Sequence, residues 1–437
     1  MEVPQWLVCK YDSFKKLRRK IFCVILFLMK KNVLKSLLAL GLLVSGFLGF
    51  AQEYDVLKDA PAEVKERIAK ADEFIAQKQY ASANGALGLD DNEYIIYKRT
   101  ELYTQYFVQS LMHQMFVIKN LEKNEDLLDL RLNFTGDAAM TMYNVEEVID
   151  NFQSEHGKKP ILNLALGNFY YDVSQRYGDQ WLISFDELRK LAKVNYTKAE
   201  EAGLYDNYSL FAMGTIEIND KEWEKAENHF ATLVKVENEN ASAWYNLALT
   251  LMYQGRYEEA RENIKKSIKF ETNEDWKIDE YLLWSDSYLY KDDVDGAIKV
   301  LNEGKKKLKN NLNVTFELGK IYFVYKYDYA KAEKEFIAAV KSEPRVVSDV
   351  LALIAQTQDW ENYIKFIEKA KKLHSKDDEY QGYVGYMAAQ GYLIKGDFES
   401  AKKELDNAEN KLKKAEVYED YEETFVEMRE LCAEQGK

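Results

Sequence analysis

The sequence predicts an all-α fold, an α-solenoid in which antiparallel helix pairs stack along the chain. Two observations lead to this prediction. Proline is rare in the 437 residues, with 4 copies, and glycine is modest, with 20, which favours long helices over sandwiches and linkers. In addition, one pattern of small and large residues recurs six times between residues 226 and 401.

The pattern is anchored on a residue that is usually alanine. The six anchors are Ala226, Ala260, Ala297, Ala332, Tyr363 and Ala401. Each anchor is followed after four residues by a large apolar residue, and it is flanked seven residues later and about twelve residues earlier by mostly small ones. Paired helices approach to roughly 8–10 Å, so small residues are needed where they cross. One pair cannot bury its apolar face alone, so the pattern predicts stacked pairs.

The best copy of the pattern spans residues 241–274. It carries Trp244, Leu247, Ala248, Gly255, Tyr257 and Ala260. With these residues the segment resembles the tetratricopeptide repeat, a helix–turn–helix unit of about 34 residues. The resemblance implies a tetratricopeptide array over residues 207–411. It weakens at Val294, Leu351 and Tyr363, where bulk departs from the pattern, and at one inserted residue near Tyr327.

The flanking segments are predicted to be helical as well. Residues 52–206 are interpreted as diverged helical repeats, with one unit around Ala71, Tyr80 and Ala83. Within this half, residues 92–123 are predicted to form one long amphipathic helix. Residues 412–437 are highly charged, which is typical of a C-terminal capping helix.

The start of the chain has the layout of a secretory signal peptide over residues 29–51. A basic head at Lys30 and Lys31 precedes an uncharged apolar run, and small residues end it, which predicts cleavage after Ala51. Residues 1–28 are interpreted as a non-native extension, with translation starting at Met29. We therefore expect an exported protein without a spanning helix in the mature chain, periplasmic or outer-membrane-associated if the host is Gram-negative.

Charge and cysteine content exclude several classes of partner. Residues 1–51 hold nine basic and two acidic residues, so the remainder has 60 − 9 = 51 basic and 72 acidic residues (74 − 2), a formal charge of −21. Such a field repels nucleic acid and favours basic partners. Cys432 is the single cysteine after residue 51, so neither an intrachain disulfide nor a cysteine-rich metal site is expected there.

Catalytic and cofactor-binding motifs are not found in the sequence. The histidines lack a second ligand at helical spacing and are interpreted as surface or boundary residues: His113, His156, His229 and His374. Carboxylate pairs such as Asp292/Asp293 and Asp377/Asp378 fall in predicted turns, where solvation explains them. We therefore predict a protein that is not an enzyme and needs no cofactor or metal.

The resemblance also implies a concave groove, lined from the first helix of each repeat. Carried over by position, the partner-binding groove comprises Tyr208, Phe211, Tyr245, Leu249, Met252, Tyr253, Leu282, Tyr290, Phe316, Phe323, Tyr383 and Tyr386. Apolar bulk at these positions indicates either a ligand or burial against neighbouring repeats, and both readings stay open. The basic residues Lys320 and Arg345 stand beside Asp279 and Asp286, which argues against a clamp for a C-terminal carboxylate.

The sequence thus predicts an exported, non-catalytic scaffold that binds a protein or peptide through an aromatic concave groove, with an acidic charge that favours a basic partner. The alternative is a helical envelope protein that binds or processes carbohydrate, using the same aromatic residues for stacking.

Overall fold

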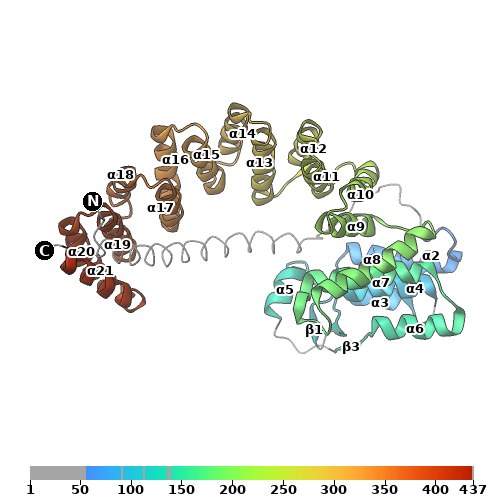
Figure 1. Ribbon diagram of the computed structural model, residues 1–437. Helices are drawn as coiled ribbons and strands as arrows, with labels where there is room; N and C mark the ends of the chain where they lie inside the picture. Colours follow the sequence, from blue (N-terminus) through green and yellow to red (C-terminus); the bar gives the residue numbers. More distant parts are fainter. Residues whose placement is uncertain (1–55, 90–91, 112–113, 135–138, 436–437) are drawn as a thin grey trace, which may run out of the picture. The chain divides into compact units, whose positions relative to one another are not determined.

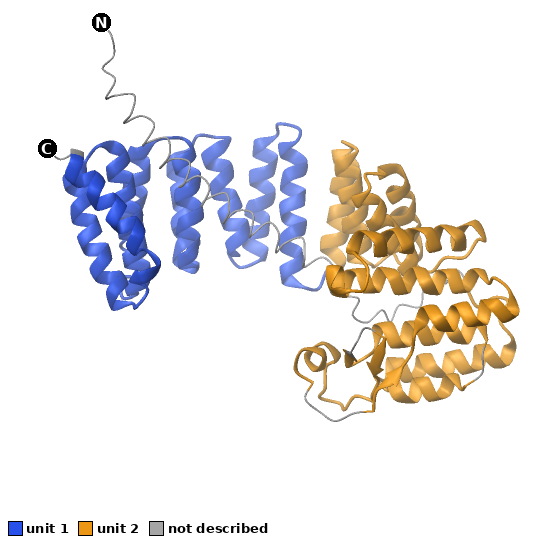
Figure 2. Cartoon of the chain, turned by 60° about the horizontal axis from the view of Figure 1, so that its bottom comes forward, with its two compact units in different colours: residues 1–27, 271–437 blue, residues 28–270 orange. Residues whose placement is uncertain are grey.

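The computed structural model describes residues 56–89, 92–111, 114–134 and 139–435. The predicted signal peptide and N-terminal extension lie outside these residues. The described residues divide into two compact units, 56–270 and 271–435, here called the N-terminal and C-terminal units (Figure 2). Each unit is described by itself. No helix of the described residues is both long and apolar enough to span a membrane.

The N-terminal unit consists of helices and one small sheet (Figure 1). Four helix pairs pack within it, α2 with α3, α7 with α8, α9 with α10, and α11 with α12. Its elements are α2 (Ala62–Ala76), α3 (Tyr80–Leu87), α4 (Glu93–Gln105), β1 (Gln109–Leu111), β2 (Met115–Val117), α5 (Leu127–Asn133), β3 (Thr141–Met142), α6 (Val145–His156), α7 (Pro160–Tyr177), the 3-10 helix η2 (Gly178–Gln180), α8 (Phe185–Glu201), α9 (Asn207–Asn219), α10 (Trp223–Val236), α11 (Ala241–Tyr253) and α12 (Tyr257–Phe270).

The described residues of the C-terminal unit form no strand and continue the helix pairs as α13–α14, α15–α16, α17–α18 and α19–α20. The last helix, α21, packs on α20 and α19, as expected of a cap. The elements are α13 (Glu274–Leu289), α14 (Val294–Lys307), α15 (Leu312–Val324), α16 (Tyr329–Ser342), η3 (Pro344–Val346), α17 (Val347–Gln356), α18 (Trp360–Ala370), α19 (Asp378–Lys395), α20 (Phe398–Lys414), η4 (Tyr418–Asp420) and α21 (Glu422–Gln435). The predicted fold class, a solenoid of stacked antiparallel helix pairs, is confirmed.

Asparagine and aspartate side chains start most of these helices. Asp206 and Ser209 form a capping box at α9, in which each side chain binds the other's backbone N–H. At later helices the side-chain oxygen of the N-cap residue accepts a hydrogen bond from a backbone N–H of the first turn. These N-cap residues are Asn240, Asn273, Asp293, Asn311, Asp328, Asp359, Asp377 and Asp397. Such caps satisfy backbone donors that have no partner inside the helix. The carboxylates at 293 and 377 are therefore structural, as the sequence indicates.

The recurring small residues lie where paired helices touch. All six anchors are buried, the most exposed being Tyr363 at 3%. Gly214 of α9 faces the ring of Phe230 on α10, and a Cβ added there would stand 2.6 Å from a ring carbon. Gly319 of α15 meets Phe336 of α16 in the same way, at 2.7 Å. The glycine is thus required by close approach of the two helices.

The turn inside each pair has one left-handed residue, always five positions before the anchor. The backbone angle φ is positive at Lys221, Gly255, Asp292, Tyr327, Gln358 and Gly396. The diverged unit repeats the feature, because Lys78 has a φ of 58° five residues before buried Ala83. Only two of the six array positions are glycine, so the other turns hold a side chain in a conformation that costs about 1 kcal/mol or more.

The prediction of one helix over residues 92–123 is wrong. Helix α4 ends at Gln105, and the antiparallel strands β1, β2 and β3 follow, with Phe116 opposite Ser110 and Thr141. The side chains alternate between two cores, Phe107 and Phe116 entering one and Val108 and Val117 the other. This alternation has the period of two that is typical of a strand.

Adding a methyl group at a helix crossing should destabilise the protein. Gly214→Ala is expected to lower the free energy of unfolding by about 1–3 kcal/mol, because Phe230 must move. The measurement is urea denaturation followed by circular dichroism. Gly85→Ala is the matched control, since this helical glycine has nothing within 4 Å of the added Cβ. It should stabilise by up to about 1 kcal/mol; equal loss in both variants would contradict the crossing model.

Relieving the left-handed tyrosine should stabilise the C-terminal unit. Tyr327 has a φ of 52° and is 72% exposed, so Tyr327→Gly removes strain and little packing. The denaturation midpoint should rise by the equivalent of roughly 0.5–1 kcal/mol. Gly255→Ala, at the same turn position with a φ of 74°, should have the opposite sign. A lower midpoint for Tyr327→Gly would show that the ring itself stabilises the turn.

Candidate partner-binding faces

The first helix of each pair carries the residues predicted for the groove. In the N-terminal unit these helices are α9 and α11, and in the C-terminal unit they are α13, α15, α17 and α19. We call the side chains that lie on these helices away from the paired helix the first-helix face of each unit. The two faces are described separately.

On the N-terminal face the predicted residues divide between packing and exposure. The Tyr208 hydroxyl donates to buried Asp172, and its ring meets Tyr171 edge-on at 5.8 Å. Phe211 packs edge-on against Phe230 at 5.8 Å. Tyr208 and Phe211 therefore have structural roles, although both are half-buried rather than fully enclosed.

The residues of α11 are more accessible, with one exception. Tyr245 and Leu249 are half-buried, and Tyr253 is 55% exposed while stacking on Trp223 with ring centroids 4.6 Å apart. Met252 is only 8% exposed, so its assignment to the groove is corrected. Successive residues of a helix are turned by about 100°, so Met252 packs inside the unit while the adjacent Tyr253 remains exposed.

On the C-terminal face, Leu282 is half-buried and Tyr290, at the end of α13, is 68% exposed. Phe316 is half-buried and its ring centroid lies 5.7 Å from that of Phe336. Phe323 is 4% exposed and packs on Tyr329 and Phe336, so it belongs to the core and its groove assignment is also corrected.

The last predicted residues, Tyr383 and Tyr386, lie on α19 with ring centroids 6.4 Å apart. Tyr386 stacks on Phe425 of α21 at 5.6 Å and meets Tyr421 at 5.7 Å. The C-terminal helix therefore covers part of this ring. Burial raises the pKa of Tyr386 to about 12, so it stays a hydrogen-bond donor at neutral pH.

Carboxylates accompany the apolar residues of the C-terminal face. The pKa of Asp286 is raised to about 6, because burial and then the neighbouring Glu317 raise it while Lys320 opposes the change. The Lys320 ammonium is itself paired with Glu317 at 2.6 Å. The pKa of Asp279 and that of Asp349 are also raised by burial. Negative charge on this face is thus poorly compensated.

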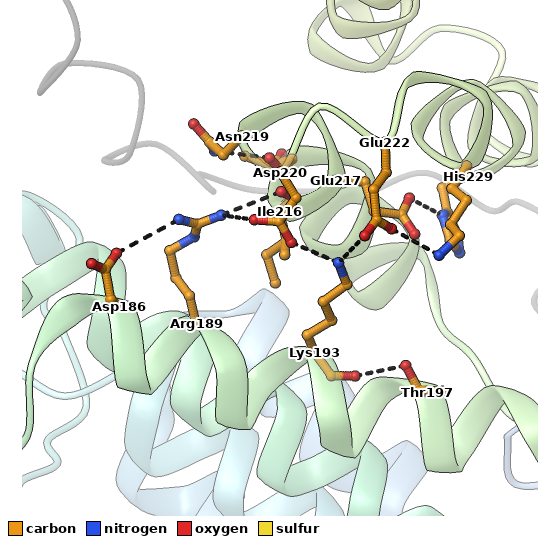
Figure 3. Close-up of polar contacts among 12 residues, drawn as sticks. Asp186, Arg189, Lys193, Thr197, Ile216, Glu217, Asn219, Asp220, Glu222 and His229 are labelled. Carbon is orange, nitrogen blue, oxygen red and sulfur yellow. Dashed lines mark hydrogen bonds and ion pairs between the residues drawn. The ribbon is translucent and has the colours of Figure 1, made fainter.

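A second polar feature, which the sequence does not indicate, links α8, α9 and α10 (Figure 3). The Arg189 guanidinium reaches Asp220 at 3.1 Å, and Lys193 reaches both Asp220 at 2.6 Å and Glu222 at 3.0 Å. These contacts tie α8 to the turn between α9 and α10. They join residues about 30 positions apart, which no local pattern predicts.

His229 of α10 completes this network. Its Nδ1 lies 2.6 Å from Glu217, which is 1% exposed, and its Nε2 lies 2.8 Å from Glu200. Burial alone would lower the pKa of His229, but the hydrogen bonds to Glu200 and Glu217 outweigh it and raise the pKa to about 9. The ring is therefore an imidazolium at neutral pH, and its two N–H groups donate to the two carboxylates.

No arrangement suited to metal binding is found among the described residues, where no group of three histidine, cysteine or carboxylate side chains is placed to hold an ion. Asp378 pairs with Lys411 at 2.6 Å and Lys414 at 2.7 Å. This acid of the Asp377/Asp378 pair is therefore held in ion pairs with α20, whereas the sequence interpretation explained it by solvation in a turn.

Comparison with known proteins identifies one repeat directly. Residues 241–273, which are α11, α12 and their flanks, match the family model described as tetratricopeptide repeat. No curated protein sequence matches the chain. The chain thus contains a tetratricopeptide repeat, and the buried positions of that repeat recur in the neighbouring helix pairs of each unit.

Solved structures with similar helices are remote in sequence. A tetratricopeptide repeat protein from Parabacteroides merdae is 15% identical, with 56% of this chain and 91% of that chain covered and a TM-score of 0.38. PilF of Pseudomonas aeruginosa is 16% identical, covering 51% of this chain and 97% of that one, with a TM-score of 0.35. Yeast Tom70 is 15% identical, covering 85% and 84%, with a TM-score of 0.38.

The His229 network should make stability depend on pH. The pKa is about 9 when folded against 6.5 for an ordinary histidine, so the ring binds its proton more tightly in the folded chain. Its contribution, about 3 kcal/mol, is complete below pH 6.5 and is lost as pH rises through 9. Urea denaturation between pH 6 and 10 (roughly the range of this titration) measures it.

His229→Gln should lower stability at pH 6 and remove most of the loss between neutral and alkaline pH. His156→Gln is the matched control, because His156 is 51% exposed on α6. A parallel pH profile for wild type and His229→Gln would contradict the charged state of the ring.

Proposed function

We propose that this protein is an exported, non-catalytic scaffold that binds a protein or peptide through its first-helix faces. The observation that carries the proposal is the accessibility of large apolar side chains at first-helix positions. Tyr253 and Tyr290 occupy the same repeat position on α11 and α13 and are 55% and 68% exposed. Exposed aromatic side chains of this size are the usual anchors of protein interfaces.

The division of labour within a helix pair supports this reading. Second helices α10, α12, α14, α16, α18 and α20 direct the buried anchors and the large residues that follow them into the packing. First helices bury their small residue, such as Gly214 or Gly319, together with several apolar residues, and leave another side of the helix for contacts with other molecules. Tetratricopeptide repeats resembling residues 241–273 use this side to bind proteins, and the proposal extends that use to the present chain.

Export rests on the sequence of residues 29–51, with its basic head and apolar run. The excess of acidic residues that follows favours a basic partner and raises the rate of encounter at low salt.

Removing the exposed tyrosines should strongly reduce partner capture without unfolding the chain. The experiment uses tagged residues 52–437, either as wild type or with Tyr253→Ala and Tyr290→Ala. Each protein is cross-linked in the envelope fraction of the host, and the proteins recovered with the two forms are compared. Recovery of the wild-type partner should fall about tenfold, because each anchor is worth about 1 kcal/mol or more. Circular dichroism should change little, since both rings are largely exposed.

The control variant carries Leu182→Ala and Val426→Ala, which remove exposed apolar side chains (79% and 50%) outside the first helices. It should capture the partner as wild type does. Undiminished capture by the tyrosine variant would overturn the proposed binding faces.

A further inference from the structure

One helix of the C-terminal face presents acidic and apolar side chains in alternation. Asp279, Leu282, Asp286 and Tyr290 follow one another at spacings of three, four and four residues along α13 and its C-cap, so they share one side of the helix. Asp279 is exposed to solvent, yet the surrounding protein raises the pKa of its carboxyl. Asp286 is half-buried. The stripe thus combines apolar contact area with one exposed and one half-buried carboxylate.

A third carboxylate lies on the same face of the unit, on α17. Asp349 is half-buried. On α19, the pKa of Tyr383 is raised chiefly by burial and further by its neighbours Tyr421, Tyr386 and Asp349. Tyr383 therefore places an aromatic ring near this acid. The combination of acid and aromatic ring is suited to the ammonium or guanidinium group of a basic side chain.

These three carboxylates lack the cations that acids of the second helices have. Across α14, α16, α18, α20 and α21, Lys305 pairs with Glu335, Lys371 with Glu404 at 2.6 Å, and Arg429 with Asp406 at 2.7 Å. Among the ion pairs of the described residues, none includes Asp279, Asp286 or Asp349. Lys320, whose charge lowers the pKa of Asp286, forms its ion pair with Glu317.

We propose that the first-helix face of the C-terminal unit binds a protein segment in which lysine or arginine alternates with aliphatic residues. One basic side chain pairs with Asp286 and another with Asp349, while aliphatic residues lie on Leu282, Phe316 and Tyr290. The inference rests on the proposed function and deepens it by naming the chemistry of the partner. A cation that pairs with one of these half-buried acids gains more electrostatic energy than it would at an open surface, because water screens the pair less.

The test uses residues 52–437 and two fluorescent probes measured by polarisation at low salt. One probe is a short peptide in which lysine, leucine and serine repeat, and the other has glutamate in place of lysine. Wild type should bind the lysine probe at least about tenfold more tightly than the glutamate probe. Asp286→Asn with Asp349→Asn should weaken the lysine probe about tenfold and should not weaken the glutamate probe.

The matched control is Glu303→Gln with Glu399→Gln, which removes two exposed carboxylates from second helices α14 and α20. Because its net charge equals that of the aspartate variant, it should change affinity for the lysine probe less than about twofold, by a long-range effect only. If both double variants lose affinity for the lysine probe equally, the proposed site is overturned. Binding would then reflect only the general attraction of a basic peptide to an acidic protein.

The remaining outcomes separate this inference from the proposed function. If both probes bind equally and Tyr290→Ala weakens both, the face binds peptides but the preference for basic segments is overturned. If Tyr290→Ala leaves binding of the lysine probe unchanged, the proposed face itself is overturned. Absence of binding by either probe also rejects the inference.

Discussion

The close contact between a small residue on one helix and a large ring on its partner is the constraint on which both units depend. At each such crossing an added Cβ would lie within 3 Å of the opposing side chain. This holds for Gly167 against Tyr196, Gly214 against Phe230 and Gly319 against Phe336. Gly391 of α19 meets Tyr363 at a similar distance, but across two successive pairs, because Tyr363 lies on α18. At Gly304 the roles are exchanged, because the glycine is on the second helix and Tyr281 comes from the first. The two helices therefore stay equally close whether the first or the second helix carries the glycine.

This packing determines which surfaces remain for other molecules. Each first helix needs many of its residues for packing: α11, for example, buries seven residues, against three on its partner α12. The remaining side of a first helix is open to other molecules. Met252 and Phe323 show where that need prevails, since both are buried despite lying at positions expected to be open. Tyr253 and Tyr290 lie at the ends of their helices, where packing does not bury them. The candidate binding faces are therefore a consequence of how the pairs close.

Charges follow the same division. In the N-terminal unit, His229, Glu217 and Glu200 place a cation and two anions inside a three-helix junction, where they compensate one another. In the C-terminal unit, Asp286 and Asp349 remain without such compensation on the first-helix face. A buried charge that is paired stabilises a junction, and one that is unpaired favours a cation from elsewhere. The two units thus use similar residues for different purposes.

The sequence by itself determined the helix pairs, their order and the crossing residues, because small side chains at a fixed period report directly on contacts between neighbouring helices. It also indicated the caps and the turns, which depend on local backbone chemistry. Only the tertiary structure decided that residues 109–111 and 115–117 form strands, where side chains such as Phe116 and Val117 enter two different cores. It also decided the partners of His229 and the burial of Met252 and Phe323, because these depend on helices that meet in space without any repeating pattern in the chain.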